Sequence, residues 1–136
     1  MKRLLFIFIV FMFVVNAKPH LDHENYGKWV MLTELNNKNM IYEPCYSGNR
    51  FINYQKGKLD DYTGQEMISC EIKLSYFKDG KYFIDLEPKC RYSDSISYEV
   101  KDENTLIWHL YHSFSLVMTN QPDKFDKVYE TCEEIQ

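Results

Sequence analysis

Apolar and polar residues alternate with a period of two along most of the chain after Gly27. Ile72, Leu74 and Tyr76, for example, are separated by single polar residues. Strict alternation of this kind indicates a strand with one buried and one solvated face. We therefore expect about eight strands, which cover residues 29–33, 51–52, 72–76, 82–86, 96–100, 106–110, 114–118 and 128–132.

Turn-forming residues separate the expected strands. Lys78-Asp79-Gly80-Lys81 is a hairpin signal, and Asp102-Glu103-Asn104 is typical of another turn. We expect loops at Asn36–Asn39 and at Gly57–Gly64, and a short helical turn at Leu21–Tyr26. Consecutive hairpins predict an all-β fold, an antiparallel up-and-down β-barrel, with a β-sandwich as the alternative.

Residues 1–17 have the features of a signal peptide. Lys2 and Arg3 precede an apolar run from Leu4 to Val15, and Ala17 is a small residue at the expected cleavage point. The apolar run is shorter than the roughly 20 residues of a membrane-spanning helix. We therefore expect a secreted or periplasmic protein, a single domain over residues 18–136, with no stable membrane span after cleavage. An uncleaved short anchor is the alternative.

All four cysteines lie in the part of the chain that is expected to be exported. An even number of cysteines in an oxidising compartment favours disulfides, and no C-x-x-C spacing supports a zinc site. A three-residue loop at 79–81 would set Tyr76 opposite Ile84, with apolar residues facing each other, and would set Cys70 opposite Cys90. Of the three connectivities that four cysteines allow, this register favours Cys70–Cys90 and Cys45–Cys132.

Charge and motifs exclude several classes of function. The chain has 16 basic and 20 acidic residues, a net charge of −4, which argues against a nucleic-acid partner. It contains no nucleophile elbow, zinc-protease motif or phosphate-binding glycine loop, so we expect neither an enzyme nor a cofactor. His109 and His112 would chelate a metal only if the chain turned between them, so we expect no metal site.

Gly27-Lys28-Trp29, at the start of the first expected strand, resembles the Gly-x-Trp signature of bacterial lipocalin-like domains. The string of short amphipathic strands that follows extends the resemblance over nearly all of the exported chain. The resemblance implies a small eight-stranded barrel whose interior holds one small apolar or amphipathic ligand. In a short barrel the same interior can instead be filled by side chains.

The expected interior positions are the candidate ligand-binding residues. Tryptophans on inward faces line a cavity or plug a barrel, and tyrosines on these faces offer an apolar ring with a hydroxyl that needs a partner. If the barrel is hollow, we expect the ligand to contact Trp29, Ile72, Tyr76, Tyr82, Leu86, Tyr98 and Trp108.

A second resemblance suggests a different class of function. Ser47-Gly48-Asn49-Arg50-Phe51 is similar to a loop of the small periplasmic lysozyme-inhibitor barrels. This resemblance implies a filled barrel that acts on a protein partner through its loops. The loop Tyr46–Phe51 and the segment Asp60–Gly64 are the candidate contact sites, and a plain turn after a disulfide-bonded cysteine is the simpler interpretation of the first.

Overall fold

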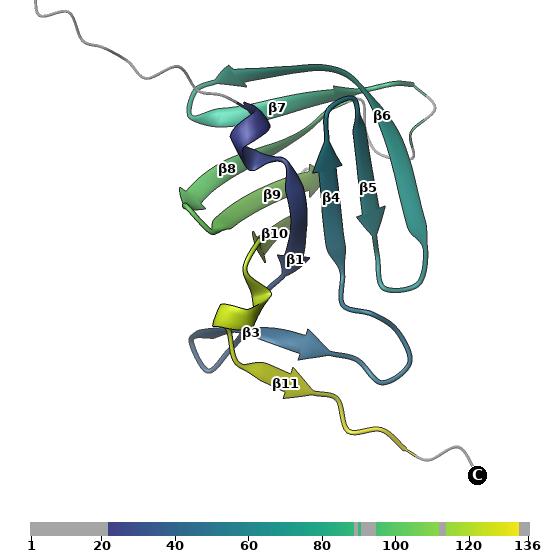
Figure 1. Cartoon of the computed structure of the whole chain (residues 1–136), viewed down its shortest axis with the longest axis vertical. Helices are drawn as coiled ribbons and strands as arrows, with labels where there is room; N and C mark the ends of the chain where they lie inside the picture. Colours follow the sequence, from purple (N-terminus) through teal and green to yellow (C-terminus); the bar gives the residue numbers. More distant parts are fainter. Residues whose placement is uncertain (1–21, 89, 91–94, 112–113, 134–136) are drawn as a thin grey trace, which may run out of the picture.

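The computed structural model describes residues 22–88, 90, 95–111 and 114–133. The expected signal peptide, and His112 of the histidine pair, lie outside the described residues. A short 3₁₀ helix, η1 (Asp22–Asn25), precedes a closed barrel of eight strands (Figure 1). The strands are β1 (Gly27–Met31), β4 (Phe51–Gln55), β5 (Lys58–Tyr62), β6 (Met67–Lys78), β7 (Lys81–Leu86), β8 (Ser95–Asp102), β9 (Thr105–Tyr111) and β10 (Phe114–Thr119).

The predicted antiparallel up-and-down barrel is confirmed. From β4 to β10 each strand pairs with the next along the chain, and β1 closes the barrel between β10 and β4. Inward positions alternate with outward ones, so Tyr82, Ile84 and Leu86 of β7 are all buried. The inward side chains of the eight strands form one apolar core.

A small three-stranded sheet lies beside the barrel, next to the end of β1 (Figure 1). It contains β2 (Thr33–Leu35), β3 (Lys38–Glu43) and β11 (Lys127–Tyr129), and β11 runs parallel to β3. The expected barrel strand at 128–132 is therefore wrong, because β11 pairs outside the barrel. The loop expected at Asn36–Asn39 is only a two-residue turn, in which Asn36 and Asn37 have φ of 52° and 61°. Asparagine tolerates this left-handed conformation, which two-residue hairpin turns require.

The loop expected at Gly57–Gly64 is also wrong, because Lys58–Tyr62 forms β5 in the barrel wall. Leu59 and Asp61 are its inward, buried positions. The sequence of β5 does not alternate between apolar and polar residues, because Asp61 takes an inward position at which an apolar residue is expected. Strand β5 thus replaces the misassigned last strand and keeps the barrel at eight strands.

The β6–β7 hairpin differs from the expected register. Its turn has two residues instead of three, so Lys78 pairs with Lys81, and Tyr76 lies opposite Phe83 rather than Ile84. An irregularity between Ile72 and Leu74 shifts the register by one more residue, which sets Ile72 opposite Leu86. One extra residue on a strand reverses the faces of all the residues beyond it. The faces of the β6 residues near the hairpin tip are therefore the opposite of those expected, whereas Ile72 and the residues of β7 keep the expected ones.

Both predicted disulfides are confirmed. Cys70–Cys90 has a Cα–Cα distance of 5.2 Å and bridges β6 to the segment after β7. Cys45–Cys132 has a Cα–Cα distance of 5.6 Å and ties the segment after β3 to the segment after β11. The described residues contain no free cysteine. Disulfides persist in oxidising compartments, so these two indicate a non-cytoplasmic location.

An ion pair helps to hold the small sheet together. Lys38 at the start of β3 donates a hydrogen bond from Nζ to Asp126, just before β11. This hydrogen bond, and next the positive charge of Lys38, lower the pKa of Asp126 below its ordinary value. The stabilisation is present above the ordinary pKa of an aspartate and is lost as the pH falls through the lowered one.

The substitution Lys38→Met is expected to return the pKa of Asp126 to its ordinary value. The Asp126 carboxyl signal, followed by NMR through an acid titration, measures this change. A pKa that is equally low in the variant would show that Lys38 does not cause the shift. Lys127→Met is the control, because Lys127 pairs with Glu43 instead.

Candidate functional site

The seven predicted ligand-binding residues do not all face the interior. Trp29, Tyr82, Leu86, Tyr98 and Trp108 are buried in the core, and Ile72 packs against it half-buried. The inward placement of Tyr76 is wrong, because the shorter turn puts it on the outer face. There its side chain is 41% exposed and stacks on Phe83, with ring centroids 5.3 Å apart. The role of these residues in ligand binding stays a prediction.

Four aromatic side chains meet inside the barrel. The ring of Trp108 lies 4.8 Å from that of Tyr98 and 5.7 Å from that of Tyr54. Tyr98 in turn stacks on Tyr82, with ring centroids 4.8 Å apart and an angle of 8° between the planes. Tyr54 was not among the predicted residues, because the strand expected here covered only residues 51–52, whereas β4 continues to Gln55. The aromatic cluster of Tyr54, Tyr82, Tyr98 and Trp108 therefore fills part of the interior.

Helix η1 contacts this cluster from one end of the barrel. Asn25 donates a hydrogen bond from Nδ2 to the hydroxyl oxygen of Tyr98 at 3.2 Å. The ring of Tyr26 packs edge-on against Tyr54 at 4.9 Å. Because β1 begins directly after η1, we call this the η1 end of the barrel. The opposite end lies where β1 finishes, and there the Met31 amide donates to the Arg50 carbonyl; we call it the Arg50 end.

The two tryptophans differ in how their indole N–H groups are satisfied. Trp29 donates from Nε1 to the carbonyl oxygen of Asn25 at 2.9 Å. Trp108 is fully buried, and its Nε1 has no hydrogen-bond partner in the described part of the chain. A buried donor without an acceptor costs about 1–3 kcal/mol. The indole of Trp108 thus offers a donor that no described residue uses, inside the apolar core.

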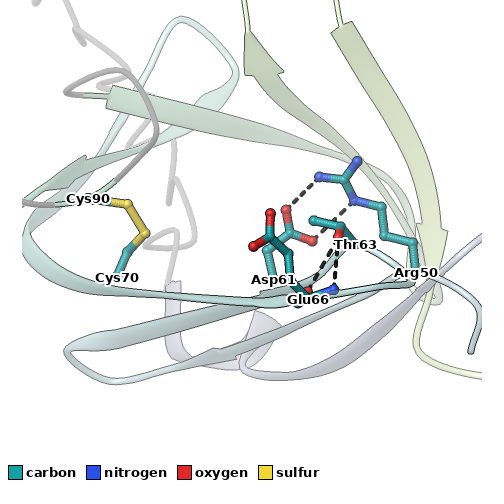
Figure 2. A network of polar contacts seen from close by, with 6 residues as sticks. All are labelled: Arg50, Asp61, Thr63, Glu66, Cys70 and Cys90. Atoms are coloured by element: carbon teal, nitrogen blue, oxygen red, sulfur yellow. Dashed lines mark hydrogen bonds and ion pairs between the residues drawn. A yellow bond between two sulfur atoms is a disulfide. The ribbon is translucent and has the colours of Figure 1, made fainter.

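An ion pair lies in the barrel near the Arg50 end (Figure 2). Arg50 donates from Nε to one carboxylate oxygen of Asp61 at 3.1 Å, and from Nη2 to the other at 2.5 Å. The Asp61 side chain has no exposed surface, and that of Arg50 is 15% exposed. This pair was missed because Asp61 was assigned to a loop. An arginine just before a strand and an acidic residue at an inward strand position were the available signals.

The guanidinium group of Arg50 has donors beyond those that bind Asp61. Arginine carries five N–H donors. Among the described residues, the guanidinium group of Arg50 uses two of them, both on Asp61. The group also lies 5.5 Å from the ring centroid of Phe114, the first residue of β10. Beside the pair, Figure 2 shows Thr63 and Glu66, which close the turn between β5 and β6. The site therefore combines a buried charge pair, unused donors and an aromatic ring.

The loop proposed to meet a protein partner lies near the disulfide Cys45–Cys132. Tyr46 is 72% exposed and donates from its hydroxyl to the carbonyl of Glu133 at 2.6 Å. Tyr129, on β11, is equally exposed. Only part of this segment is loop, since Phe51 begins β4. Of the second candidate segment, Asp60–Tyr62 is strand and only the residues after it form a turn.

Both ring nitrogens of His109, on the outer face of the barrel, lie within hydrogen-bond distance of neighbouring side chains. Its Nδ1 lies 2.8 Å from the hydroxyl of Ser115, and its Nε2 lies 2.5 Å from a carboxylate oxygen of Glu99. The three residues come from the neighbouring strands β8, β9 and β10. The arrangement links three strands on the barrel surface, and it was not recognised in the sequence because the residues are far apart there.

Within the described residues, no helix is long and apolar enough to cross a membrane. A scan against protein-family models, a search of curated proteins and a search of solved structures found no match to this chain.

Proposed function

We propose that the protein is an exported, lipocalin-like binding protein. It holds a small molecule with an apolar or aromatic body and a hydrogen-bond acceptor inside the barrel. The unpartnered Nε1–H of Trp108 carries this proposal, because it is a buried donor for which the described residues supply no acceptor. Polar groups buried in native proteins are normally satisfied, by protein, water or ligand.

Two further features support the proposal. The interior of a closed eight-stranded barrel is wide enough to hold one small ligand where side chains do not fill it. The Arg50–Asp61 pair gives the interior a second polar feature. A carbonyl or carboxylate oxygen of the ligand can accept a hydrogen bond from the guanidinium group. Such an interior suits an amphipathic molecule better than a purely apolar one.

The first test is native mass spectrometry of the protein recovered from the exported fraction, beside its denatured mass. We expect an extra mass that disappears on denaturation. The denatured mass is expected to be that of residues 18–136 with both disulfides intact. A bare native mass would contradict a tightly held ligand and would favour a barrel that acts on a partner.

Trp108→Phe and Trp29→Phe form a matched pair, because among the described residues the N–H of Trp29 has an acceptor and that of Trp108 has none. Trp108→Phe is expected to raise the dissociation constant of the captured ligand about 2- to 10-fold, from the loss of a net hydrogen bond of about 0.5–1.5 kcal/mol. Trp29→Phe is expected to raise that constant less, because the N–H of Trp29 already donates to the Asn25 carbonyl. Isothermal titration calorimetry with the ligand identified by mass spectrometry measures both constants. Equal losses in the two variants would contradict the assignment to Trp108.

A protein-interaction function is the second candidate. Tyr46 and Tyr129 are the most exposed large hydrophobic residues described, and tyrosine is enriched at protein interfaces. Both lie near the disulfide Cys45–Cys132, which fixes the loop that would meet the partner. A bare native mass, together with loss of partner binding in Tyr46→Ser, would support this function instead.

A further inference from the structure

A cavity open to solvent lies at the η1 end of the barrel, and Tyr82 of the aromatic cluster forms part of its wall. It has a volume of about 480 Å³ and is bounded by η1, the β6–β7 hairpin and the β8–β9 turn. The residues that matter for its chemistry are Glu24, Phe77, Tyr82, Val100, Asp102 and Glu103. Arg50 and Asp61 do not line it, so this cavity is separate from the polar site at the other end of the barrel.

The walls of this η1-end cavity are partly aromatic. The side chain of Phe77 is 38% exposed and that of Val100 is 48% exposed, although both are apolar. The Phe77 ring lies 4.8 Å from the Tyr82 ring, tilted by 58°. Tyr82 stacks on Tyr98, which holds it in place. Aromatic faces attract cations through their electrostatic quadrupole.

The charged groups in the cavity wall all have the same sign. Glu24, Asp102 and Glu103 contribute carboxylates, and neither lysine nor arginine is among the described lining residues. The backbone N–H of Asn104 donates to Asp102 Oδ1 at 2.9 Å, which holds that carboxylate at the β8–β9 turn. Lys78 and Lys81 flank the hairpin turn at opposite positions of β6 and β7. Neither residue is among those that line the cavity.

Cavity, aromatic walls and carboxylates together define one class of ligand. The three carboxylates disfavour an anion, and a bare metal ion would leave the exposed apolar walls in water. A cation with apolar substituents satisfies both parts of the lining. We propose that the η1-end cavity binds a small organic cation, an ammonium group that carries alkyl or aromatic substituents.

Choline is a suitable probe, because 3,3-dimethylbutan-1-ol has the same shape without the charge. Each compound is titrated into the disulfide-bonded protein and followed by NMR at the backbone amides of Gly80, Val100 and Glu103. We expect choline to give saturating shifts there and none at Arg50. We expect the neutral alcohol to bind at least about 5-fold more weakly, because it lacks the attraction of the charge to ring and carboxylates.

Variants separate the two parts of the lining. Phe77→Leu keeps an apolar side chain but removes the ring, and is expected to weaken choline binding about 2- to 5-fold. The double variant Glu24→Gln and Glu103→Gln keeps the shape of both side chains and is expected to weaken it about 5-fold. Glu34→Gln, on the exposed strand β2, is the matched control and is expected to leave binding unchanged.

The proposal is overturned by any of three results. Choline gives no saturating shift at these amides, or the alcohol binds as tightly as choline, or the carboxamide double variant binds choline like the unmodified protein. A thermal melt of each variant shows that it is folded. Because the charge variants leave the core intact, they test the site even if Phe77→Leu does not fold.

Discussion

Replacing Arg50 with methionine is expected to lower the free energy of unfolding by about 3–5 kcal/mol. The reason is the position of its partner, since the Asp61 carboxylate has no exposed surface and depends on two charge-assisted hydrogen bonds from Arg50. Methionine retains the apolar stem but removes the charge. The buried Asp61 carboxylate thereby loses the positive charge of Arg50, and this cost exceeds the net gain from the pair itself.

Urea unfolding of four proteins measures this effect: the unmodified chain, Arg50→Met, Asp61→Leu and the double variant. The double variant is expected to recover most of the stability lost in Arg50→Met, because a well-packed apolar pair replaces a buried ion pair at little cost. Lys38→Met, which breaks the exposed pair with Asp126, is expected to lower the free energy of unfolding far less than Arg50→Met does. A loss in Arg50→Met as small as this control would contradict the buried-charge explanation.

Removing the disulfide Cys45–Cys132 is expected to destabilise the protein more than removing Cys70–Cys90. Each bond restricts the unfolded chain and typically contributes about 2–4 kcal/mol, more when the closed loop is longer. The separations are 87 and 20 residues, so the Cys45–Cys132 pair restricts the unfolded chain more strongly. The comparison uses Cys→Ser at both members of each pair.

Denaturant unfolding of the two double-serine variants gives the order of the losses. Hydrogen exchange adds a second readout, because β11 has only three residues to hold it on β3. In the variant without Cys45–Cys132, the amides of Lys127–Tyr129 are expected to exchange before those of the barrel. An equal or greater loss in the variant without Cys70–Cys90 would contradict the loop-length argument.

The barrel could be predicted from the sequence because its signals are local. Period-two alternation assigned most strands and their faces, and short turns between them required antiparallel neighbours. The disulfide Cys70–Cys90 was also predicted correctly, although the register near the hairpin tip was wrong. The irregularity between Ile72 and Leu74 restored the inward face of β6 before Cys70 was reached.

The features that were missed depend on contacts between distant residues. Strand β5 was not predicted, because a charged residue, Asp61, occupies one of its inward positions. A carboxylate is favourable there only when Arg50 lies beside it. The parallel pairing of β11 with β3 joins segments from opposite ends of the chain, and no local pattern indicates it. The outward position of Tyr76 depends on one residue of turn length, which the sequence Lys-Asp-Gly-Lys does not determine.

The pairing of Cys45 with Cys132 has a consequence for the order of events as the chain is made. Synthesis proceeds from the N-terminus, so Cys45 becomes available first and Cys70 second, and these two are not partners. Cys45 must stay reduced, or exchange a wrong partner, until Cys132 has emerged, 87 residues later in the chain. Oxidation in the order of appearance would trap a mispaired chain. A compartment that reshuffles disulfides as well as forming them therefore favours a high yield of the native protein.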